Sequence, residues 1–146
     1  MSLLSLLQPE VEHASRIPWE QPDLAPYFRG LVAADLAEDI ALTPCTLLVP
    51  NQTAWKQLPL PLDRLLWDPA FVETRFDFFE HTVIPGIHCA HRRRRSVHTL
   101  QGGEIMLGDS RVVGWRGAGN VVRSLMTNGL LVHVVDALVH SGSMTP

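Results

Sequence analysis

The sequence has little of what would mark a specialised class of protein. Its two cysteines, Cys45 and Cys89, allow at most one disulfide, which excludes a small domain held together by disulfides. The 12 basic and 15 acidic residues leave a net charge of -3, so no general attraction to nucleic acid or anionic lipid is expected. Apolar runs such as 130–135 are far shorter than the roughly 20 residues that cross a bilayer. We therefore expect no membrane span and no nucleic-acid partner.

Export and cofactor signals are also scarce. The apolar start, residues 1–7, has no basic leader and no small-residue cleavage site, so it does not predict a signal peptide. The chain is then either cytosolic or a mature or excised piece of a longer protein, and the sequence does not choose between these. No pattern calls for a cofactor, and we expect none.

Apolar residues make up 46% of the chain, enough for one hydrophobic core in a single domain. Three prolines among polar residues predict an irregular lead-in over 1–22, after a short helix at 3–7. We place the domain at 23–140 and a tail at 141–146.

Helical patterns dominate the first half of the domain. Apolar residues three and four apart predict two short helices over 24–36, divided near Asp35, with Asp23 as N-cap. A buried strand at 46–49 ends at a proline, and Asn51 can cap a short helix behind it. Asp68 followed by proline opens a further helix over 70–80.

The second half consists of β-prone runs between turn residues. Strands are predicted at 82–84, 97–100, 104–107, 111–115 and 130–135. Glycine pairs and Gly-Asp or Asn-Gly steps supply the positive-φ turns that hairpins need. Helices followed by antiparallel strands indicate an α+β fold rather than an alternating nucleotide-binding fold.

Short motifs occur in a fixed order along residues 24–139. They are TLLVPNQTAW at 46–55, LP at 58–59, FFEHTVIPG at 78–86, TLQGG at 99–103 and TNGLLVHVVD at 127–136. Together they resemble the motifs of the fasciclin domain, the module of fasciclin I, periostin, stabilins and secreted bacterial proteins. The resemblance implies a wedge of two antiparallel β-sheets with helices packed along one side. It also implies a non-enzymatic adhesion module, extracellular or periplasmic, that binds proteins or polysaccharides.

The run Arg92, Arg93, Arg94 and Arg95 is the sharpest chemical feature. Adjacent guanidinium groups repel one another, and each offers a planar fork of donors for sulfate, phosphate or carboxylate. The run predicts a surface for a protein or an acidic polysaccharide such as a glycosaminoglycan, together with His91 and Asn51. It also fits a solvated loop that keeps a hairpin edge soluble.

Histidines provide the alternative. His81, His88, His91 and His98 with Cys89 could serve a small ligand or a metal, although their spacing matches no structural zinc pattern and we assign no metal ligand. The two cysteines are either bridged or two buried thiols. A weaker third hypothesis is a hydrolase with Ser96, His98 and Asp109, or with Cys89 and a histidine, which no nucleophile-elbow pattern supports. We therefore predict no catalytic residue.

Overall fold

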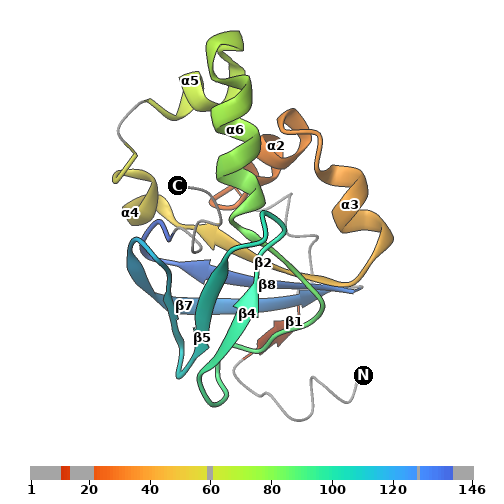
Figure 1. The fold of residues 1–146 in the computed structure, drawn as a ribbon, viewed down its shortest axis with the longest axis vertical. Coiled ribbons are helices and arrows are strands. Elements are labelled where there is room, and N and C mark those ends of the chain that lie inside the picture. Colours follow the sequence, from red (N-terminus) through yellow and green to blue (C-terminus); the bar gives the residue numbers. More distant parts are fainter. Residues whose placement is uncertain (1–10, 14–21, 59–60, 128, 140–146) are drawn as a thin grey trace.

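The computed structural model describes residues 11–13, 22–58, 61–127 and 129–139, which form the α+β architecture predicted (Figure 1). The helices are α2 (Ala25–Ala33), α3 (Ala37–Leu42), α4 (Gln52–Trp55), α5 (Leu62–Trp67), the 3-10 helix η2 (Pro69–Phe71) and α6 (Val72–Glu80). The strands are β1 (Val11–His13), β2 (Cys45–Pro50), β3 (Val83–Pro85), β4 (Arg95–His98), β5 (Glu104–Gly108), β6 (Arg111–Val113), β7 (Ala118–Thr127) and β8 (Leu130–Val135). None of the helices in these ranges is long and apolar enough to cross a membrane.

The strands join in the order β3-β2-β8-β7-β6-β5-β4, and β1 pairs with β7. Most neighbours are antiparallel, but β2 with β8 and β1 with β7 are parallel. Wholly antiparallel sheets are therefore not confirmed. Parallel neighbours need a long connection, and the whole segment from α4 to β7 separates β2 from β8.

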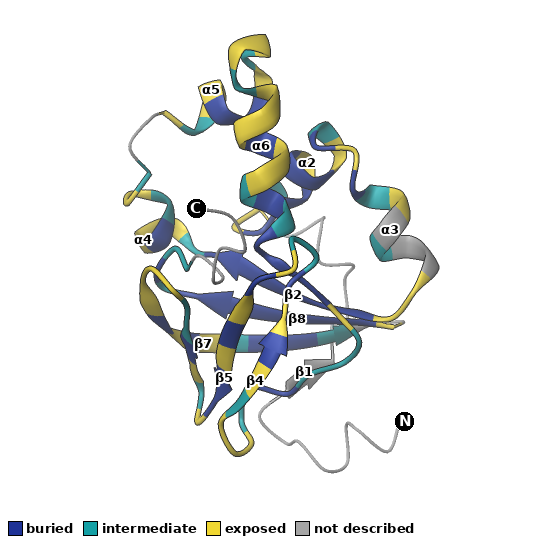
Figure 2. Ribbon diagram, viewed as in Figure 1, coloured by how far each residue is buried: buried dark blue, intermediate teal, exposed yellow. Residues whose placement is uncertain are grey.

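Strands β2 and β8 are buried along their whole length, with packing on both faces (Figure 2). Leu47 and Val49 of β2 pack in a core with the helices, whereas Leu48 between them packs in a second core with β4, β5 and β6. Successive side chains of a strand point to opposite faces, so one strand serves both cores.

The helical core is closed by a contact between α2 and α6. Gly30 lies so close to Phe79 that a Cβ there would be 2.0 Å from the ring Cζ. The Tyr27 hydroxyl meets the Thr82 hydroxyl at 2.7 Å, and Thr82 in turn donates to the Phe79 carbonyl at 2.6 Å. Because Thr82 spends its proton on that carbonyl, Tyr27 is the donor in the buried pair.

Several local predictions are confirmed. Two short helices flank Asp35, whose φ is 62°. Asn51 caps α4 by accepting from the Ala54 amide at 3.0 Å, and Asp68 caps η2 by accepting from the Ala70 amide at 2.9 Å. The expected cap at Asp23 is wrong, because Leu24 begins α2 without a side-chain cap and Asp23 lies 3.7 Å from Arg123.

Other elements were missed. The sequence predicts no strand at β7 and no helix at α5, and residues 11–13 fall in the predicted irregular lead-in although β1 pairs with β7. Arg75 of α6 is buried and links that helix to the end of α5. Its side chain donates to the carbonyl of Leu65 at 2.7 Å and to that of Asp68 at 3.0 Å. The helix expected at 3–7 lies outside the described residues.

We expect Gly30→Ala to destabilise the fold by about 2 kcal/mol, because overpacking against Phe79 outweighs the better helix propensity of alanine. Urea unfolding would measure this. Phe79→Leu in the same chain should recover part of the loss, while Val32→Ala, exposed on α2, should change stability little. A Gly30→Ala variant as stable as the parent would contradict the packing account.

Candidate functional site

The arginine loop, residues 90–95, covers the end of the β3–β4 connection and the first residue of β4, and it is fixed to the β5–β6 turn, residues 108–111. The Asp109 amide donates to the Arg92 carbonyl and the Ser110 amide donates to the Ala90 carbonyl, both at 2.7 Å. Gly108, with φ of 154°, packs so tightly that a Cβ would lie 2.2 Å from the Arg94 Cα. Loop and turn therefore form one unit, and only glycine fits at their contact.

The four arginines of the run have two different roles. Arg95 is half-buried and donates to the Cys89 carbonyl at 2.8 Å, with longer bonds to the carbonyls of Arg93 at 3.3 Å and Leu107 at 3.4 Å. Arg92, Arg93 and Arg94 are exposed. Arg95 thus holds the loop from beneath and leaves three guanidinium groups facing solvent.

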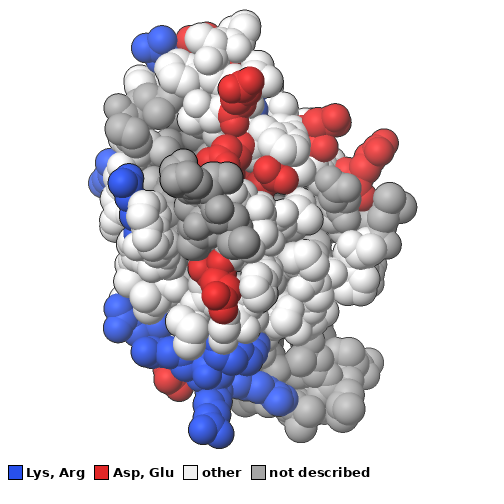
Figure 3. Space-filling view, in the orientation of Figure 1, with Lys and Arg blue, Asp and Glu red and all other residues white. Residues whose placement is uncertain are grey.

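Basic side chains gather at one end of the molecule (Figure 3). On the face shown, acidic side chains lie mostly toward the end where α3 and α6 are found. Arg111, exposed at the start of β6, pairs with Gly108 and so lies across that glycine from Arg94. Sequence reasoning missed Arg111, since only strand pairing brings it beside the run.

Behind the loop runs a chain of hydrogen bonds that we call the histidine–serine chain. It joins Ser110 Oγ to His91 Nδ1 at 2.8 Å, His91 Nε2 to Ser124 Oγ at 3.0 Å and Ser124 Oγ to His133 Nδ1 at 2.7 Å. His133 Nε2 ends the chain at the His88 carbonyl, 2.9 Å away. The chain connects the β5–β6 turn, the arginine loop, β7 and β8.

One carbonyl sets the direction of every bond in this chain when both imidazoles are neutral. The His88 carbonyl can only accept, so His133 carries its proton on Nε2 and accepts from Ser124 on Nδ1. Ser124 then accepts from His91 Nε2, and His91 Nδ1 accepts from Ser110. Every ring nitrogen is used.

The interior of this chain is kept uncharged. The pKa of His133 is lowered to about 4, chiefly by burial; the bond to the His88 carbonyl opposes the shift, and the charges of His91 and Arg95 add to it. Neutral His133 matches the requirement of the chain, in which its Nδ1 must accept from Ser124.

The structure separates the residues expected to bind a partner. His91 is half-buried with both ring nitrogens bonded, which makes it a support for the loop. Asn51 caps α4, and its own amide donates to the Val135 carbonyl of β8 at 2.9 Å. The arginine loop instead contacts the β5–β6 turn, so none of the described contacts joins Asn51 directly to the arginine run.

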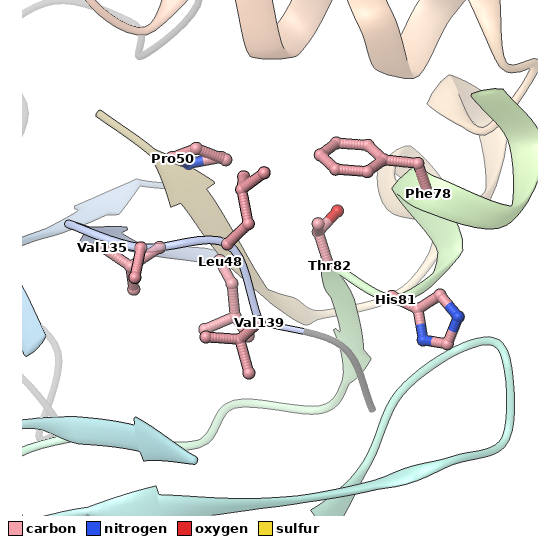
Figure 4. A pocket seen from close by; sticks show the side chains of 9 residues that line it. Leu48, Pro50, Phe78, His81, Thr82, Val135 and Val139 are labelled. Carbon is pink, nitrogen blue, oxygen red and sulfur yellow. The ribbon is translucent and has the colours of Figure 1, made fainter. Parts of the chain in front are cut away.

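The histidine-rich segment is the alternative candidate site for a small ligand or a metal. Within the described ranges, no group of three His, Cys, Asp or Glu side chains is placed to hold a metal. A small pocket beside α6 contains one histidine, His81, among mainly apolar side chains such as Leu48, Phe78 and Val139 (Figure 4). His81 there lies 3.5 Å from Asp77.

The cysteines are buried, and the candidate nucleophiles make structural contacts. Cys45 and Cys89 are free and buried, and burial raises the pKa of the Cys45 thiol to about 11. Ser96 is hydrogen-bonded to Glu104 across β4 and β5, while Asp109 lies beside Arg94. The described contacts therefore do not assemble Ser96 and Asp109 into one group.

Comparison with known proteins identifies the fold. No protein-family model matches the sequence, and no curated protein matches it. Among solved structures, a FAS1 domain pair from the insect cell adhesion molecule fasciclin I matches with a TM-score of 0.59 and 16% sequence identity. The match covers 82% of this chain and 46% of that structure, so the chain spans about half its length. The chain has a fasciclin-like fold.

We expect stability to fall as the pH drops from about 6.5 toward 4. In the unfolded chain His133 has an ordinary pKa near 6.5 and is protonated below that pH, whereas in the folded chain it stays neutral down to about pH 4. The contribution of neutral His133 to the free energy of unfolding is therefore complete above pH 6.5, and about 3 kcal/mol of it is lost by pH 4. Urea unfolding across this range should show a smaller pH slope for His133→Asn. An unchanged slope would refute the assignment.

We expect Arg95→Gln to cost about 1–3 kcal/mol, because the half-buried carbonyl of Cys89 loses a charged donor. Arg93→Gln, the matched change on the exposed side of the loop, should alter stability by less than about 0.5 kcal/mol. Denaturant midpoints of the two variants test the division of the run. Equal losses would mean that Arg95 does not anchor the loop.

Proposed function

We propose that the chain is a non-enzymatic adhesion or recognition module that works outside the cytoplasm and binds a polyanionic glycan through Arg92, Arg93 and Arg94. The observation that carries this proposal is the division of the arginine run. Arg95 and the backbone bonds to the β5–β6 turn fix the loop, so three exposed guanidinium groups are presented on a rigid support. A rigid site loses less conformational entropy on binding than a mobile one.

The chemistry of the surface favours a partner with many anionic groups. An exposed guanidinium–anion pair contributes only about 0–1 kcal/mol, so a single small anion would bind weakly. A sulfated polysaccharide engages several arginines at once, and the planar forks of donors on their guanidinium groups suit sulfate oxygens. The loop itself, from Ala90 to Arg95, contains no Phe, Tyr or Trp on which bases could stack, which disfavours single-stranded nucleic acid.

The fold supports the same direction. The solved structure that it resembles comes from an insect cell adhesion molecule, and adhesion places a module outside the cell. Fold alone does not fix function, so the proposal depends on the arginine surface.

We expect the triple variant Arg92→Gln, Arg93→Gln and Arg94→Gln to lose at least about tenfold in affinity for heparin, since three contacts of roughly 0.5 kcal/mol or more are removed. Binding of the parent should weaken as salt rises from 50 to 150 mM, because screening reduces exposed charge interactions. Surface plasmon resonance on immobilised heparin would measure both effects.

The control variant carries Arg29→Gln, Arg64→Gln and Arg116→Gln, three arginines outside the loop whose loss changes net charge by the same amount. It should bind almost as the parent does. Equal loss in the two variants would show general charge attraction and refute a site at the loop. A parent that ignores sulfated glycans but binds acidic protein segments would replace the glycan by a protein partner.

A further inference from the structure

Asp109 places a carboxylate inside the arginine surface. Its Oδ2 lies 3.9 Å from Arg94 Nε, and both side chains are largely accessible, 65% for Asp109 and 45% for Arg94. Asp109 precedes Ser110, which begins the histidine–serine chain, and its own amide is bonded to Arg92. An acidic group therefore sits where an anionic ligand of Arg94 would bind.

The backbone holds Asp109 in this position. Asp109 and Ser110 have φ of 53° and 59°, as in a two-residue hairpin turn with both central residues left-handed. Asp and Asn tolerate this conformation better than other residues with a side chain. The bond from the Asp109 amide to the Arg92 carbonyl and the Gly108 contact with Arg94 prevent the turn from moving away from the loop.

We propose that Asp109 is a specificity-determining residue of the arginine surface, acting as an internal competitor of the ligand for Arg94. This inference rests on the proposed function. Because Asp109 is on the same chain, it faces Arg94 at an effective concentration that a dilute, isolated carboxylate does not reach. A densely charged glycan already held by Arg92 and Arg93 delivers its next anion intramolecularly and displaces Asp109.

Arg111 strengthens the selection. It pairs with Gly108 across the β5–β6 hairpin, and the backbone of Arg94 packs against the same glycine, so both arginines lie beside Gly108. A ligand that displaces Asp109 gains access to this second cation. A ligand with sparse charge reaches Arg92 and Arg93 alone.

The test compares heparin with chemically desulfated heparin, which keeps carboxylates but has lost the closely spaced sulfates. Asp109→Asn keeps the turn conformation and removes the charge. It should raise the affinity for desulfated heparin by roughly two- to fivefold and the affinity for heparin by less. The ratio of the two affinities, which measures the preference for heparin, should therefore fall. The same substitution in an Arg94→Gln chain should have no effect, since the competitor then has nothing to occupy.

Asp63→Asn, an exposed change of equal charge on α5, is the matched control and should leave the preference unchanged. The inference is overturned if Asp109→Asn behaves like this control, or if its effect is equal with and without Arg94. The proposed function still stands in that case if the triple arginine variant loses affinity for heparin in the same experiment. Absence of binding by the parent and by Asp109→Asn overturns both.

Discussion

The structure depends on two neighbouring strands, β2 and β8, that have no solvent-facing side. Each packs against helices on one face and against the curled remainder of the sheet on the other. Every side chain along them must suit an apolar interior, and the alternation of Leu47, Leu48 and Val49 divides one strand between two cores. A shift of one residue in register would exchange the cores, so the six-pair register with β8 fixes the packing of both.

One of the two buried polar residues on these strands, Thr46 and His133, determines how the surface is built. His133 lies on β8 with 0% exposure, and a buried imidazole must satisfy both nitrogens. It does so through Ser124 on one side and the His88 carbonyl on the other, and the bonds continue through His91 to Ser110. A requirement of the interior thus fixes the residue that precedes Arg92. The exposed guanidinium groups are positioned from within the fold.

Local chemistry allowed much of the fold to be predicted. Asn51 and Asp68 act as caps because their side chains reach amides only a few residues away, and helical spacing is also local. β7 was missed because it begins with Ala118, Gly119 and Asn120, which are poor strand formers, and becomes a strand through pairing on both sides. Arg93 and Arg95 are identical in sequence terms, yet one contacts solvent and the other the Cys89 carbonyl. Arg111 joins the surface through a hairpin, which spacing along the chain does not reveal.

Because Gly108 contacts the backbone of Arg94, the conformation of the arginine loop does not depend on the side chains that determine what it binds. Shape is carried by that glycine, by backbone amides and by the side chains of His91 and Arg95, none of which depends on what residues 92 to 94 are. Those three positions could therefore be substituted, in evolution or by design, without disturbing the scaffold that displays them. The same turn could therefore present acidic, aromatic or hydroxyl side chains to quite different surfaces.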